Sequence, residues 1–134
     1  RKCNMKNFKR KVVLLVASIL VMAATMTAFA SPTPRWSYIG GIQGVLEISN
    51  GNADVEVFCD ATTTGVNKVK AKCELQQLDG SWKTIKTWTE SESGTSVHYY
   101  KSYPVSESYS YRLKITGYAY NGTTLLESAT VYFY

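Results

Sequence analysis

The side chains that could perform chemistry in this 134-residue chain are few, and they form no catalytic pattern. His98 is the single histidine, and no glycine elbow or patterned serine lies near it, so a Ser-His-Asp site would lack a recognisable nucleophile. Glycoside hydrolysis would need a pair of carboxylates, for which the candidates are Glu47, Asp54, Glu56 and Asp60. Asp54 and Glu56 lie on the solvated row of an alternating segment, which accounts for them without a substrate. The sequence therefore predicts a protein that is not an enzyme.

The cysteines allow two interpretations. Outside the first 30 residues the chain contains Cys59 and Cys73, an even pair that would form a disulfide in an oxidising compartment. The alternative is that both are small buried apolar residues, a role that free cysteines also fill. Two thiols and one histidine are too few ligands for a metal site, and the sequence has no glycine-rich phosphate-binding loop. We expect neither a metal nor another cofactor.

Residues 1–30 have the organisation of a secretory signal peptide. A basic segment at 6–11 precedes an apolar run from Val12 to about Met26, and the small-x-small triplet Ala28-Phe29-Ala30 follows. We expect cleavage after Ala30, secretion, and no stable membrane insertion of the mature protein. An uncleaved anchor is the alternative, because the apolar run continues without charge to Ala30 and is long enough to span a bilayer.

The positive charge of the whole chain comes from this leader. The formal net charge is +5, with fifteen Lys and Arg against ten Asp and Glu. Six of the basic residues and none of the acidic ones lie in residues 1–30, which leaves nine basic and ten acidic side chains and a formal charge of −1. The charge is therefore no sign of nucleic-acid binding. Residues 31–35 are expected to be extended, because two prolines interrupt any helix there.

Residues 36–134 are predicted to form one all-β domain. β-branched and aromatic residues alternate with polar ones over most of this length, and no window of a dozen residues has a helical apolar period. Turn residues separate seven expected strands, which is typical of an antiparallel immunoglobulin-like or fibronectin-III-like β-sandwich. The expected strands are 43–49, 53–61, 66–78, 82–90, 95–103, 108–120 and 124–134.

Alternation also predicts which side chains form the core. Two rows of small and branched side chains share the apolar side of their strands: Ala53, Val55, Val57, Cys59 and Ala61, and then Val69, Ala71, Cys73 and Leu75. In a sandwich these two strands commonly belong to opposite sheets. A disulfide between Cys59 and Cys73 would then connect the sheets, and closing a loop of about 15 residues would stabilise the fold by about 3 kcal/mol.

Hairpin registers predict an aromatic outer face on one sheet. A three-residue loop at Asp79-Gly80 would place Leu75 opposite Ile85 and Lys72 opposite Trp88, with the indole pointing outward. A three-residue loop at Asn121-Gly122 would pair Ile115 with Ala129, Leu113 with Val131 and Tyr111 with Phe133 as core pairs. The side chains that these registers turn outward are Trp88, Arg112, Tyr118, Tyr120, Leu126, Tyr132 and Tyr134.

This outer face is the candidate binding site. Tyrosines and a tryptophan on a solvated face would make an apolar platform with polar tips. We expect a secreted binding module in which Trp88, Arg112, Tyr118, Tyr120 and Tyr132 contact an extracellular glycan, peptide or protein. One alternative is a structural protein in which the same face or the tyrosine-rich last strand mediates self-association, as in a homodimer or a surface layer. Another is that the tyrosines are ordinary strand residues without a ligand.

Tyr109 has an expected structural role. It opens the sixth strand after a proline-containing corner, in the segment Tyr109-Ser110-Tyr111-Arg112-Leu113. This position resembles the tyrosine corner of immunoglobulin-like and fibronectin-III domains. The resemblance implies that the Tyr109 hydroxyl bonds to a backbone group a few residues upstream.

Four segments carry a closer resemblance over most of the mature chain. They are Arg35-Trp36-Ser37-Tyr38-Ile39, then Leu75-Gln76-Gln77 with Ser81 to Trp88, then Tyr111-Arg112-Leu113, and finally Glu127-Ser128-Ala129. In this pattern the chain resembles an uncharacterised family of small secreted proteins of Gram-positive bacteria. The resemblance implies a secreted single-domain sandwich, and it brings no activity, cofactor or catalytic residue with it.

Overall fold

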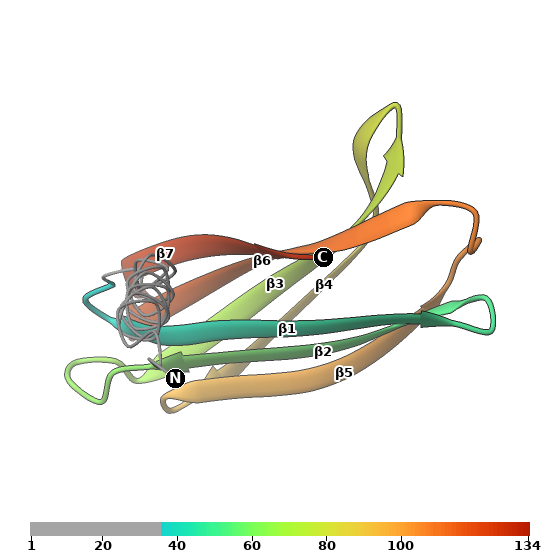
Figure 1. Cartoon of the computed structure of the whole chain (residues 1–134). Helices are drawn as coiled ribbons and strands as arrows, with labels where there is room; N and C mark the ends of the chain where they lie inside the picture. The colour runs from blue at the N-terminus through green and yellow to red at the C-terminus, as the bar shows by residue number, and fades with distance from the viewer. Residues whose placement is uncertain (1–35) are drawn as a thin grey trace, which may run out of the picture. The chain divides into compact units, whose positions relative to one another are not determined.

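The computed structural model describes residues 36–134, in which seven antiparallel strands form two sheets that pack face to face (Figure 1). The expected leader, its cleavage site and the segment 31–35 lie outside the described residues. In the described part no helix is long and apolar enough to cross a membrane. The strands are β1 (Ile39–Ser49), β2 (Asn52–Ala61), β3 (Lys68–Asp79), β4 (Ser81–Ser93), β5 (Ser96–Pro104), β6 (Ser110–Asn121) and β7 (Thr124–Phe133).

The chain passes three times between the sheets. One sheet has the order β1-β2-β5 and the other the order β4-β3-β6-β7, so the crossings follow β2, β4 and β5. The prediction of an all-β fold with seven strands is confirmed. β1 begins at Ile39, earlier than expected, because Gly40 and Gly41 shift the register without ending the pairing with β2. A Cβ on Gly40 would lie 2.6 Å from Oδ2 of Asp60, so a side chain there would require the Asp60 carboxylate to move.

The core lies between the two sheets and contains both predicted rows. Every side chain from Ala53 to Ala61 and from Val69 to Leu75 that alternation placed inward is buried. The Tyr99 hydroxyl on β5 donates a hydrogen bond of 2.9 Å to the Ala71 carbonyl on β3, which joins the sheets through the core. Gly117 lets the sheets approach closely, because a Cβ there would lie 2.7 Å from Sγ of Cys59.

Cys59 and Cys73 are free thiols, and both are fully buried. The structure therefore contains no Cys59–Cys73 disulfide, and the second interpretation, two small buried residues, describes it. Burial raises the pKa of each thiol to about 12, and the neighbouring carboxylates Asp60 and Glu74 add to the rise for Cys59 and Cys73 respectively. Thiolate is scarce at such a pKa, so neither sulfur has the form that reacts in thiol–disulfide exchange.

A β-bulge in β4 changes which face Trp88 occupies. The predicted register holds near the turn, where Gln76 is opposite Thr84, but a shift between Leu75 and Gln76 places Leu75 opposite Lys86 and Cys73 opposite Trp88. Because opposite residues share a face, Trp88 points toward the core, and the predicted outward pairing with Lys72 is wrong. The indole packs edge-on against Tyr103, with ring centroids 6.4 Å apart.

The register of β6 with β7 is two residues from the predicted one, which preserves the faces. Leu113 is opposite Phe133 and Ile115 opposite Val131, so the same side chains point inward as expected. A bulge where Ala119 and Tyr120 pair with β7 then redirects Leu126, which packs against the core instead of lying on the outer face.

The hydrogen bond to an upstream backbone group that was expected of Tyr109 is made by Tyr111. The Tyr111 hydroxyl donates a hydrogen bond to the Ser106 carbonyl, five residues upstream, and its side chain is buried. Tyr109 is exposed. The prediction chose the wrong residue because β6 begins at Ser110, which puts the inward position at the second tyrosine of the segment.

Candidate functional site

Aromatic and cationic side chains gather on the outer face of the four-stranded sheet. Directly opposite residues on neighbouring antiparallel strands share a face, so the register identifies the members of this face. They form two clusters along β6, one around Arg112 and one around Tyr118 and Tyr120. Six residues of strand separate Arg112 from Tyr118, or roughly 20 Å. The clusters are therefore separate features of one surface.

Arg112 is held by three aromatic rings and two hydrogen bonds. Its guanidinium carbon lies 4.3 Å from the centroid of Trp82, 4.5 Å from that of Tyr132 and 5.9 Å from that of Tyr134. Nε donates to Oε1 of Gln76 at 2.8 Å, and Nη1 donates to the Tyr134 hydroxyl at 3.2 Å. Cation–π contacts of this kind contribute about 0.5–1 kcal/mol each when exposed. The three rings and the two hydrogen bonds together fix the guanidinium of Arg112 in one orientation.

A groove of about 720 Å³ lies beside this cluster. Trp82 and Tyr134 belong to both, because they contact Arg112 and also line the groove. The remaining lining residues come from the ends of β1, β3 and β6 and from the β5–β6 connection: Ile48, Leu78, Glu107, Tyr109, Ser110 and Tyr111. Its volume falls within the range of about 300–1,000 Å³ that small-ligand sites have.

The second cluster is covered by its own lysines. Tyr118 and Tyr120 stack with centroids 6.4 Å apart and an interplanar angle of 25°. Nζ of Lys70 lies 4.3 Å from the Tyr118 centroid, and Nζ of Lys68 lies 4.6 Å from the Tyr120 centroid. The tyrosines are half-buried. Since lysine side chains lie on the rings, this cluster offers charge to a ligand more readily than bare aromatic surface.

The structure brings together some of the predicted site residues and separates others. Arg112 and Tyr132 lie in one cluster, Tyr118 and Tyr120 lie in the other, and Trp88 lies on the opposite side of the sheet. Among the aromatic partners of Arg112, Trp82 is the one that sequence reasoning missed. The three-residue loop at Asp79-Gly80 places Trp82 opposite Leu78 and therefore outward, so the signal was present in the register already considered.

Charge on this face is strongly one-sided. Its cations are Lys68, Lys70, Lys72, Arg112 and Lys114, which the register places outward on β3 and β6. Glu74 is the outward carboxylate between them, with Oε2 at 3.8 Å from Nζ of Lys114 and 4.0 Å from Nζ of Lys72. One carboxylate does not balance five cations, so the face attracts anions.

The residues considered for catalysis lie on the outer face of the other sheet. Nε2 of His98 lies 2.8 Å from Oε1 of Glu56, and the Tyr100 hydroxyl donates to the same oxygen at 2.9 Å. These hydrogen bonds, with that from His98 the larger cause, lower the pKa of Glu56 below its usual 4.5. Within residues 36–134 no group of three or more His, Cys, Asp and Glu side chains is positioned to hold a metal ion.

The chain matches none of the models of known protein families and none of the curated proteins with which it was compared. Its resemblance to secreted proteins of Gram-positive bacteria therefore stays a prediction from the sequence. Inference about function has to come from the surface chemistry described above.

Proposed function

We propose that the protein is a secreted, non-enzymatic binding module that recognises an acidic extracellular glycan with Arg112 and the adjoining groove. The observation that carries the proposal is the fixed guanidinium at the edge of a concave aromatic surface. The organisation of residues 1–30 as a signal peptide supports secretion.

Arg112 has the donors that an acidic ligand needs. An arginine carries five N–H groups, and two of those on Arg112 are used by Gln76 and Tyr134, so three find no acceptor within the described residues. A planar guanidinium binds carboxylate or phosphate through two parallel hydrogen bonds. Because the aromatic rings already fix its orientation, Arg112 loses little side-chain freedom on binding.

The groove supplies the surface on which a sugar ring can lie. Trp82, Tyr109 and Tyr134 line it, and Tyr109 and Tyr134 are 42% and 81% exposed. Aromatic rings of this kind combine an apolar body with a polar tip, which suits a ligand that has both C–H faces and hydroxyl groups. An acidic sugar would place its ring in the groove and its anionic group at Arg112.

A fibronectin-III-like scaffold is the fold that we propose for the domain. Two features support it. The fourth strand pairs with the third, which gives sheets of three and four strands, and Tyr111 makes the corner hydrogen bond at the start of the sixth strand. Such a sandwich is a rigid support for a ligand site at one end of its sheets.

Binding to defined polysaccharides tests the proposal. The purified protein is mixed with a polyuronate, a phosphate-linked wall polymer and a neutral glucan, and the bound fraction is measured. We expect binding to an acidic polymer, and a loss of about tenfold or more in the Arg112→Lys variant, because lysine keeps the charge but lacks the planar fork. Trp82→Ala should weaken the same binding.

Tyr118→Ala is the matched control, since it removes an aromatic ring from the same face at the second cluster. Its binding should stay close to that of the unaltered protein. Equal binding of the neutral glucan, or an Arg112→Lys variant that is folded and binds normally, would show that Arg112 does not select the ligand. Circular dichroism on each variant establishes that it is folded.

A further inference from the structure

We infer that the protein self-associates by docking the acidic outer face of its three-stranded sheet onto the cationic outer face of the four-stranded sheet of a second copy. The inference goes beyond the proposed glycan recognition, because it depends on the charges of both outer faces and not on the groove beside Arg112.

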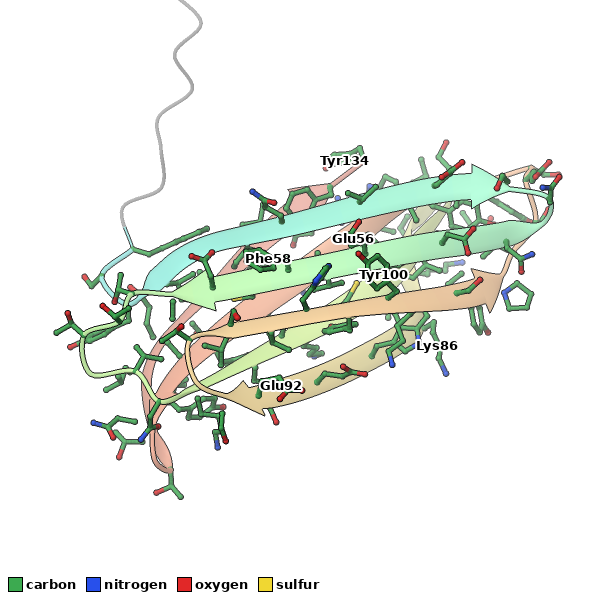
Figure 2. All side chains as sticks on the ribbon, turned by 90° about the horizontal axis from the view of Figure 1, so that it is seen from below. Glu56, Phe58, Lys86, Glu92, Tyr100 and Tyr134 are labelled. Carbon is green, nitrogen blue, oxygen red and sulfur yellow. The ribbon has the colours of Figure 1, made fainter. Side chains whose placement is uncertain are left out.

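The acidic face is formed by the outward side chains of β1, β2 and β5. Its carboxylates are Glu47, Asp54, Glu56 and Asp60, and the register places no lysine or arginine among the outward residues of these strands. Figure 2 looks onto this face, where Glu56 and Tyr100 lie over neighbouring strands and Phe58 lies further along β2. The face is therefore predominantly negative.

Two of these carboxylates, Glu47 and Asp54, lie where they repel each other. Glu47 on β1 is directly opposite Asp54 on β2, an arrangement in which like charges destabilise the sheet. Among residues 36–134 neither side chain has a hydrogen bond or an ion pair, in contrast to Glu56, which is bonded to His98 and Tyr100. A cation brought by a partner would remove this repulsion.

The acidic face is hollowed and carries exposed apolar side chains beside its carboxylates. Val45 on β1 and Tyr100 on β5 are 57% and 66% exposed, and both are directly opposite Glu56 on the central strand β2. They line a groove of about 490 Å³ together with Glu47, Asp54, Glu56 and Lys101, whose ammonium lies 2.6 Å from Oε1 of Glu90. Apolar surface next to charged side chains is common in protein interfaces.

The four-stranded sheet of another copy carries the complementary charge. Lys72 projects from the middle of its outer face, with its side chain 40% exposed. A lysine can lay its methylene stem along apolar surface such as Val45 while its ammonium reaches a carboxylate. In this docking the ammonium of Lys72 lies between Glu47 and Asp54, and the neighbouring lysines face the remaining carboxylates.

The two faces lie on opposite sides of the sandwich, which fixes the kind of assembly. Pairing two acidic faces or two cationic faces would bring like charges together, so the contact joins unlike faces and generates an open stack. With sheets about 10 Å apart, each copy adds about 20 Å to the stack. Three strands of about ten residues cover roughly 14 Å by 33 Å, so each contact is small and sensitive to salt.

Light scattering on two charge-neutralised variants tests the inference. One variant, Glu47→Gln with Asp54→Asn, alters the acidic face, and the other, Lys70→Gln with Lys72→Gln, alters the cationic face. We expect the unaltered protein to form oligomers in about 0.05 M salt and to dissociate in about 0.5 M salt. Each variant alone should associate roughly tenfold more weakly.

Mixing the two variants distinguishes this contact from every symmetric one. The first keeps an intact cationic face and the second keeps an intact acidic face, so the mixture should form heterodimers about as tightly as unaltered copies associate, and roughly tenfold more tightly than either variant alone. A third variant, Asp79→Asn with Glu92→Gln, removes two negative charges that lie outside the acidic face. It should assemble like the unaltered protein. Failure of the unaltered protein to associate at low salt, or association that both face variants retain, would overturn the inference.

Discussion

On the four-stranded sheet three of the five outward cations, Lys68, Lys70 and Arg112, lie on aromatic rings, whereas on the three-stranded sheet Glu47 and Asp54 face each other without a cation in contact. Both faces arise from the same alternation of inward and outward side chains. They differ in the sign of their charge, and the rings of Tyr118, Tyr120 and Trp82 stabilise the positive charge that lies on them. Lysine and arginine are therefore stabilised within one copy on the aromatic face. On the acidic face, Glu47 and Asp54 would gain a neutralising cation only from a partner.

The largest effect is expected from the glycine that keeps the sheets together. Gly117→Val would place a Cβ 2.7 Å from Sγ of Cys59 and 3.1 Å from Cδ1 of Ile42, so the sheets would have to separate locally. We expect the free energy of unfolding to fall by about 3 kcal/mol, which chemical denaturation measures. Glycan binding and association between copies should then weaken together, because each depends on an intact sheet. A variant of unchanged stability would mean that the sheets adjust to each other more freely than the core packing indicates.

The two tryptophans of β4 lie on opposite faces of the sheet, and their substitution should affect different properties. Trp88 packs on the core, so Trp88→Ala should lower the free energy of unfolding by about 2 kcal/mol. Trp82 lies outside on Arg112, so Trp82→Ala should cost less than about 1 kcal/mol while weakening glycan binding. Thermal unfolding and binding are measured on both variants. The reverse order of stabilities would show that the bulge in β4 does not turn Trp88 inward.

Glu127 connects the two sheets where the edge strand β7 lies beside the start of the edge strand β1. Its carboxylate on β7 accepts the backbone N–H groups of Ser37, Tyr38 and Ile39, at 3.0, 2.8 and 2.8 Å. Burial raises the pKa of Glu127, but the three hydrogen bonds together outweigh burial and hold that pKa below 4.5. Glu127→Gln should lower the free energy of unfolding by about 1–2 kcal/mol at neutral pH, because an amide accepts fewer of these bonds.

The pH dependence of Glu127 has a definite sign. A carboxyl whose pKa is lower in the folded state stabilises the fold above its unfolded pKa, and this contribution disappears as the pH falls through the folded pKa. Stability of the unaltered protein should therefore decline below pH 4.5, and the gap to Glu127→Gln should narrow there. A gap that stays constant down to strongly acidic pH would contradict the role of the charged form.

The smallest effect concerns Glu56 on the acidic face. Its pKa lies below 4.5 because His98 and Tyr100 donate to its carboxylate, so the Glu56 resonance in an NMR titration should have a midpoint below that value. In the double variant His98→Gln with Tyr100→Phe the midpoint should move upward. Tyr109→Phe, which removes a hydroxyl far from Glu56, serves as the control. An unmoved midpoint would show that these hydrogen bonds do not form in solution.

Local pattern was enough to place the strands and the core. The alternation in β2 and β3 identified every buried residue from Ala53 to Ala61 and from Val69 to Leu75, because period-two burial is a property of each strand alone. Sequence reasoning also placed Arg112, Tyr118, Tyr120 and Tyr132 on one face, since a register error of two residues leaves the faces unchanged.

The β-bulges made the alternation rule assign the wrong face to two side chains. A single extra residue in β4 moved Trp88 from the outer face to the inner one, and a second bulge in β7 moved Leu126 in the same way. Alternation carries no signal for an inserted residue, because the strand remains equally favourable on either side of the bulge. The contact of Arg112 with Trp82 was missed for another reason: the predicted register already placed Trp82 outward, but the contact joins β4 and β6 across the intervening β3.

The sequence by itself determined the strands, their inward rows and the charge that remains outside residues 1–30, because each follows from residue types and spacing along one segment. Tertiary structure decided the rest. Which sheet each strand joins separates the carboxylates of β1 and β2 from the lysines of β3 and β6, and the bulge in β4 turns Trp88 inward while Trp82 stays on the outer face beside Arg112. Those outcomes depend on pairing between distant segments, whose energies no single segment contains.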